Sequence, residues 1–156
     1  GLDISGFSDP VSVLDLWSSR CGAVPREHGV YLVRRLLTTE PEFPRSSEAG
    51  GVKGQNPSYP LEVVEQNWLR QASAVCIGKA GGSSGLRQRL GQLIDFAFGK
   101  PIGHGGGRML WHLADWKDPQ VQRSICAFGL ADDLETNLIG KFRQRHAARP
   151  FANMVK

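Results

Sequence analysis

Long hydrophobic runs are missing from this sequence: none approaches the roughly 20 apolar residues that a membrane-spanning helix needs. A basic-then-apolar leader is also missing at its start. Cysteine is scarce, and Cys21, Cys76 and Cys126 form an odd set without metal-ligand spacing. Thiols of this kind are typical of reduced proteins without structural disulfides. We therefore expect a cytoplasmic protein that does not act at a membrane.

A strong charge bias is lacking as well. The 156 residues include 19 Lys and Arg and 15 Asp and Glu, for a net charge of +4 and a pI near 9.2. With 40% hydrophobic residues, the composition is that of a globular chain and not of a disordered one. We expect residues 1–156 to form a single domain. Its mild basicity favours a nucleic-acid partner without requiring one.

The most informative stretch is glycine-rich and lies near the middle of the chain. Residues 74–77 are apolar and too short for a helix, which favours a strand, and Gly78, Gly81 and Gly82 follow. Ser83 or Ser84 is a suitable N-cap for a helix. Apolar residues then recur at helical spacing, as in an amphipathic helix: Leu86, Leu90, Leu93, Ile94, Ala97 and Phe98.

This strand, turn and helix have the parts of an anion site. Backbone N–H groups, a helix N-terminus, and the cations Lys79, Arg87 and Arg89 would converge on one small volume, as they do around bound phosphate. The same pattern is also typical of a tight turn without a ligand.

The rest of the chain predicts a small sheet with helices around it. Asp9 and Pro10 favour a helix over about residues 9–20, with Asp9 as the N-cap. Proline and glycine predict a long loop within an insertion that spans about residues 38–72 and ends in a helix. We expect an α/β (α+β) fold with a mainly antiparallel sheet of three strands, at residues 29–37, 74–77 and 124–130.

Five elements in this order resemble the motifs of the GIY-YIG nuclease superfamily. They are Gly29-Val30-Tyr31, Cys76-Ile77-Gly78 with Lys79, Arg89 in the central helix, Glu135 in the last helix, and Asn153 after Pro150. The resemblance covers the chain from about residue 25 onward, apart from the insertion. It implies a GIY-YIG-like fold and a metal-dependent endonuclease that hydrolyses phosphodiester bonds in DNA.

The resemblance also implies roles for particular residues. Glu135 would be the metal ligand, for Mg²⁺ or Mn²⁺, and Arg89 would bind the scissile phosphate. Tyr31 would orient or deprotonate the attacking water, and Lys79 would contact phosphate or lower the pKa of a neighbouring group. Further substrate or catalytic contacts would come from Arg87, Asn153 and His104.

Several of these residues have a simpler alternative. Asp132 to Glu135 has the spacing of a capping box, and Tyr31 is also an ordinary strand residue. Arg87 and Arg89 are suitable surface residues of a helix, and His104 is a suitable loop residue.

Two features depart from the superfamily: Cys76 stands where it usually has a second tyrosine, and the insertion lengthens a normally short connection. An alternative function is therefore a weakened or inactive nucleic-acid-binding module. Another is a partner-binding domain that uses residues 38–60. Its partner would be another protein, or a second copy of the chain in a homodimer. Because a thiol is a weak hydrogen-bonding group, we expect Tyr31 to act on the water without help from Cys76.

Overall fold

The computed structural model describes residues 2–44, 59–100 and 107–153, and it is an α+β structure with one antiparallel sheet. The strands are β1 (Val11–Ser12), β2 (Gly29–Arg34), β3 (Ala74–Ala80) and β4 (Gln120–Ile125), and their order across the sheet is β1-β4-β2-β3. The prediction of three strands was therefore incomplete, because the short strand β1 pairs with β4. Strand β3 is the last strand at its edge of the sheet.

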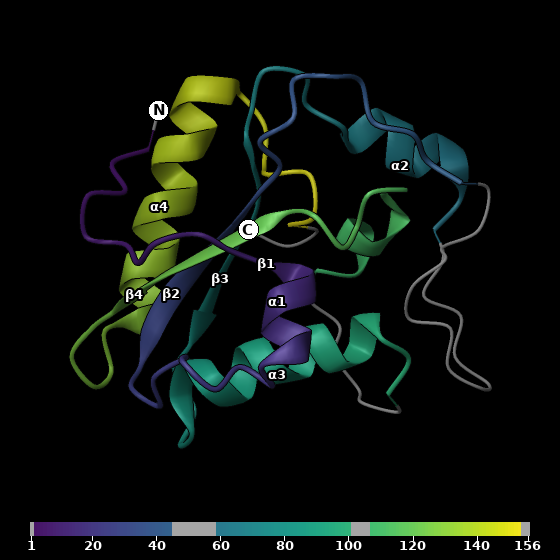
Figure 1. The fold of residues 1–156 in the computed structure, drawn as a ribbon. Coiled ribbons are helices and arrows are strands. Elements are labelled where there is room, and N and C mark those ends of the chain that lie inside the picture. The colour runs from purple at the N-terminus through teal and green to yellow at the C-terminus, as the bar shows by residue number, and fades with distance from the viewer. Residues whose placement is uncertain (1, 45–58, 101–106, 154–156) are drawn as a thin grey trace.

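The two main helices cover opposite faces of the sheet (Figure 1). Helix α3 (Gly85–Ala97) packs on the face that carries Tyr31 and Val33. Helix α4 (Ala131–His146) packs on the other face, against Leu32 and Ile77. This division follows from the alternation of side chains along β2 and β3. It leaves the outer edge of β3 between the two helices.

The predicted apolar stripe of the central helix is confirmed. Leu86, Leu90, Leu93, Ile94 and Ala97 are all buried, and only Phe98 at the helix end is partly exposed. Burial of such side chains contributes roughly 1.5–3 kcal/mol each for the larger ones. The core therefore holds α3 firmly against β2 and β3.

The N-terminal helix differs from its prediction. Helix α1 covers only Val13–Ser18, and its N-cap is Ser12, whose hydroxyl accepts a hydrogen bond from Asp15 N at 3.0 Å. Asp9 and Pro10 instead precede β1, where pairing of Val11 with Val121 keeps the backbone extended. Tertiary pairing has overridden a local helix-start pattern.

The predicted strand at residues 124–130 also lies too far along the chain. Strand β4 begins at Gln120, and its polar residues are satisfied by the N-terminal segment: Gln122 Nε2 donates to Ser8 O, and Arg123 N donates to Ser8 Oγ, both at 3.0 Å. Because several residues of β4 are polar, its hydrophobicity pattern does not predict where the strand begins. Residues 127–130 form a turn.

The remaining elements are helix α2 (Leu61–Asn67) and a 3-10 helix, η1 (Arg108–His112). Helix α2 ends before the predicted residue 72, and β2 ends before the predicted residue 37, beside a register shift at Val33 and Arg34. The described ends of the insertion pack on the core, where Phe43, Trp68 and Phe151 make an aromatic cluster.

No helix in the described ranges is both long and apolar enough to span a bilayer.

Candidate active site

A cavity of about 710 Å³ opens at the outer edge of β3, between α3 and α4. Four segments that are distant in sequence contribute to its wall: β3 with its following turn, α3, the start of α4, and the C-terminal residues Ala152 and Asn153. Tyr31 reaches the same cavity from β2. The residues of the cavity wall that bear chemistry are Tyr31, Cys76, Lys79, Gln88, Arg89, Gln92, Asp132, Glu135 and Asn153.

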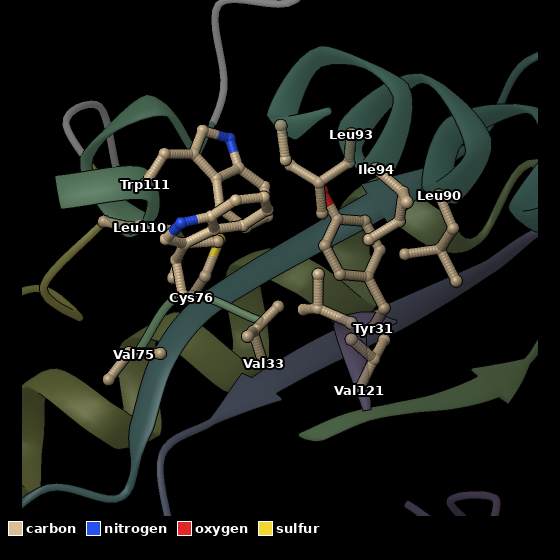
Figure 2. Packing of buried hydrophobic residues seen from close by; sticks show 14 of the residues in the cluster. Tyr31, Val33, Val75, Cys76, Leu90, Leu93, Ile94, Leu110, Trp111 and Val121 are labelled. Atoms are coloured by element: carbon tan, nitrogen blue, oxygen red, sulfur yellow. The ribbon is translucent and has the colours of Figure 1, made fainter. Parts of the chain in front are cut away.

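Tyr31 reaches the cavity because its partner on β3 is a glycine. Tyr31 pairs with Gly78, and a Cβ atom at position 78 would lie 2.2 Å from Tyr31 Cζ and 2.3 Å from Tyr31 Oη. Any larger residue would therefore displace the tyrosine ring. The ring stands between β2 and α3, beside Leu90 and Ile94 (Figure 2).

Tyr31 is only 3% exposed, and this burial is the main reason that its pKa is raised above the ordinary value. The nearby Cys76 and Glu135 raise the pKa of Tyr31 further, whereas the charge of Arg89 and a hydrogen bond with it oppose the rise. The phenol is therefore protonated at neutral pH. A protonated phenol suits the orienting role better than the role of base.

Cys76 lies on the same face of the sheet as Tyr31. It pairs with Val33, is buried in the α3-side core, and points toward Trp111 in Figure 2. Burial raises the pKa of the Cys76 thiol to about 12, with a further contribution from Glu135. A thiol that stays protonated is a poor nucleophile.

Glu135 is 8% exposed and lies in the first half of α4. A capping box needs its glutamate at the third helical position, but α4 begins at Ala131 after the N-cap Leu130, so Glu135 is the fifth residue. The capping alternative is therefore wrong. Glu135 lines the same cavity as Tyr31 and Cys76, and its charge helps to raise the pKa of both groups.

Two cations and a second carboxylate complete the charges of the cavity. Arg89 is half-buried on α3 and, like Glu135, interacts with both Tyr31 and Cys76. Lys79 forms an ion pair with Asp132, which stands one helical turn before Glu135. Arg89, Lys79, Asp132 and Glu135 thus give the cavity wall two positive and two negative side chains.

The N-terminus of α3 is not open to an anion. Gly85 N, Leu86 N and Arg87 N donate to the carbonyls of Gly82, Glu27 and Pro25 at 3.1, 2.9 and 3.0 Å. Gly85 permits this docking, since its φ is +57° and a Cβ there would lie 2.1 Å from Arg26 O. The glycine-rich stretch is therefore a tight turn at this point.

Arg87 belongs to the same docking contact. Its guanidinium donates to the carbonyls of Val24 and Gly22 at 2.8 and 3.1 Å, and Arg87 is not among the residues that line the cavity. The two arginines of α3 thus lie on different edges of the helix. Arg89 meets the cavity, and Arg87 ties α3 to the loop that precedes β2.

The side chain of Asn153 hydrogen-bonds to the main chain of β3 at its outer edge. Its Oδ1 accepts from Ile77 N at 2.9 Å and its Nδ2 donates to Ile77 O at 2.8 Å, while Ala152 N donates to Val75 O at 2.8 Å. The side-chain amide therefore takes the place of a neighbouring strand. These contacts attach residues 152–153 to the strand that carries Lys79.

Sequence reasoning overlooked several residues of the cavity wall. Gln88 and Gln92 flank Arg89 on α3, and Asp132 precedes Glu135 by three residues. Helical spacing could have predicted Gln92 and Asp132, because residues three or four apart lie on the same face of a helix, here the faces of Arg89 and Glu135. His104 lies outside the described residues.

The cavity residues fit a divalent cation held by few protein ligands. Mg²⁺ retains several waters and is commonly bound through one or two carboxylates with substrate phosphates, and the buried carboxylate of Glu135 faces such a space. Within the described ranges, no group of three or more His, Cys, Asp or Glu side chains is arranged to hold a metal. Glu135 would be the ligand, with its neighbour Asp132 paired to Lys79.

Comparison with known proteins found no matching family model, no matching curated protein and no matching solved structure.

Proposed function

We propose that this protein is a metal-dependent DNA endonuclease with a GIY-YIG-like fold. The observation that carries the proposal is the convergence of Tyr31, Lys79, Arg89 and Glu135 on one cavity. These residues come from β2, β3, α3 and α4. Residues from separate sequence motifs thus line the same cavity, which supports a shared chemical role.

The charges of the cavity suit phosphodiester hydrolysis. Arg89 lines the cavity, and its guanidinium would donate two hydrogen bonds to phosphate oxygens and stabilise the extra negative charge of the transition state. Lys79 adds a second cation at the more exposed side, where Asp132 holds it. A divalent cation bound by Glu135 would polarise the phosphate and lower the pKa of a water.

Tyr31 is the residue that would orient this water. Its phenol is protonated, so its oxygen both accepts and donates a hydrogen bond at a fixed position. The packing of its ring across Gly78 leaves it little freedom. Fixed donors and acceptors lower a barrier because they need no reorganisation during the reaction.

A plasmid-nicking assay tests the proposal. Purified protein is incubated with supercoiled plasmid and Mg²⁺, Mn²⁺ or EDTA, and nicked and linear products are measured. We expect nicking with either metal and none in EDTA. Salt-dependent DNA binding without nicking would instead indicate a binding module that lacks the chemistry. Absence of both would favour a domain that binds a protein partner.

A further inference from the structure

The turn between β4 and α4 holds an aromatic ring in solvent. Phe128 is 89% exposed, more than any other large hydrophobic side chain of the described residues. Leu130 N donates to Ala127 O at 3.1 Å and closes a turn with Phe128 and Gly129 at its centre. Gly129 has a φ of +84°, which glycine tolerates at such a position. The turn therefore presents Phe128 at its outer corner.

His28 fixes this turn from beneath. Its ring stacks on Phe128 with centroids 4.6 Å apart and an interplanar angle of 28°. Gly129 N donates to His28 Nδ1 at 3.3 Å, and Cys126 N donates to His28 O at 2.8 Å. His28 itself is buried. One face of the Phe128 ring is thus supported, and the other is open to solvent.

The turn that carries this ring forms part of the rim of the cavity. Gly129, the next residue, and Ala131 both belong to the cavity wall, which also carries the cations Lys79 and Arg89. The rim therefore suits an uncharged, flat group attached to a phosphate that lies in the cavity. A nucleobase has this chemistry.

We infer that Phe128 stacks on an unpaired base beside the scissile phosphate, so that the substrate is DNA with an unpaired or readily unstacked base. This inference rests on the proposed function. Stacking of a base on an aromatic side chain contributes about 1–3 kcal/mol and tolerates any base. A base inside an intact duplex has no free face to offer, so Phe128 discriminates between the two kinds of DNA.

The test measures DNA binding in EDTA, where no cleavage interferes. Two duplexes are compared that differ only in one unpaired 2-aminopurine. Phe128→Ala and Phe128→Leu should weaken binding of the duplex with the unpaired base by about 5- to 150-fold, the equivalent of the stacking energy. Binding of the fully paired duplex should stay within about twofold, and Phe128→Trp should retain both affinities.

Leu130→Ala is the matched control, because Leu130 is an exposed apolar residue of the same turn without an aromatic ring. It should change neither affinity. Equal losses on both duplexes, or a loss in Leu130→Ala as large as in Phe128→Ala, would overturn the inference. So would a dimer in sedimentation that Phe128→Ala dissociates, since the turn would then be an interface between copies. If only the inference about Phe128 fails, the wild-type protein still nicks plasmid. If the proposed nuclease function fails, the wild-type protein does not nick plasmid.

Discussion

At the scale of single residues, the site depends on the pairing of Tyr31 with Gly78. The ring of Tyr31 occupies the space that a side chain at position 78 would fill. Cys76 lies two residues earlier on the same strand and contributes a buried, protonated thiol. The two residues that correspond to the tyrosines of the resemblance are therefore unequal here: one has a hydroxyl at the cavity, and the other has a weak hydrogen-bonding group.

Tyr31→Phe should therefore lower the single-turnover cleavage rate by on the order of 10²-fold or more, a scale typical of losing one fixed hydrogen-bonding group of an active site. Cys76→Ser should leave the rate near that of the wild type. Both rates are measured with saturating Mg²⁺ and excess protein. A strong loss in Cys76→Ser with little loss in Tyr31→Phe would reverse the roles assigned to the two residues.

The buried thiol of Cys76 also makes stability depend on alkaline pH. Its pKa is about 12 in the folded protein, against about 9 for an ordinary thiol. The stabilisation from keeping it protonated is complete below pH 9 and is lost as the pH rises from 9 to 12. Between pH 7 and 10, the free energy of unfolding of the wild type should fall more than that of Cys76→Ala, by on the order of 1 kcal/mol.

Urea denaturation in the presence of a reductant measures this difference. Cys126→Ser is the control, since Cys126 is only partly buried and should alter the alkaline loss much less. Equal alkaline losses in the wild type and Cys76→Ala would show that Cys76 ionises freely in the folded state.

At the scale of elements, helix α3 makes different contacts along its two edges. Arg87 holds the loop before β2 through two main-chain carbonyls, whereas Arg89 faces the cavity. Arg87→Ala should lower the free energy of unfolding by about 1–3 kcal/mol, because hydrogen bonds from a charged group are lost. Its cleavage rate, measured well below the melting temperature, should change little.

Arg89→Ala should show the opposite result: near-normal stability and a cleavage rate reduced by at least about 10²-fold, as expected for a lost transition-state contact. Thermal melts and single-turnover cleavage of both variants are measured side by side. A cleavage defect in Arg87→Ala but not in Arg89→Ala would show that the phosphate contact belongs to Arg87, contrary to the proposal.

The elements that sequence reasoning predicted well are those with a clear hydrophobic period. The stripe of α3 and the buried runs of β2 and β3 belong to this group, because their burial follows from their own residues. Strands β1 and β4 were missed or displaced. Strand β1 depends on pairing with β4, and β4 depends on pairing with β2 and on contacts with Ser8, none of which a local pattern contains.

At the scale of the whole molecule, the fold gathers segments more than a hundred residues apart in sequence around one edge of the sheet. Tyr31 and Glu135 meet there because α3 and α4 cover opposite faces and leave the end of β3 between them (Figure 1). The separate motifs were visible in the sequence. The Lys79–Asp132 pair and the use of Asn153 as a substitute strand were not, since both depend on the tertiary arrangement.

The most direct test of the account is plasmid nicking by Glu135→Gln, with Asp133→Asn as the matched control. Asp133 is an exposed carboxylate of the same helical turn that does not line the cavity. With Mg²⁺, Glu135→Gln should lose nicking while its DNA affinity and melting temperature stay close to those of the wild type, because phosphate contacts supply most of the affinity. Asp133→Asn should nick normally. Nicking by Glu135→Gln at the wild-type rate would remove Glu135 from the mechanism and contradict the account.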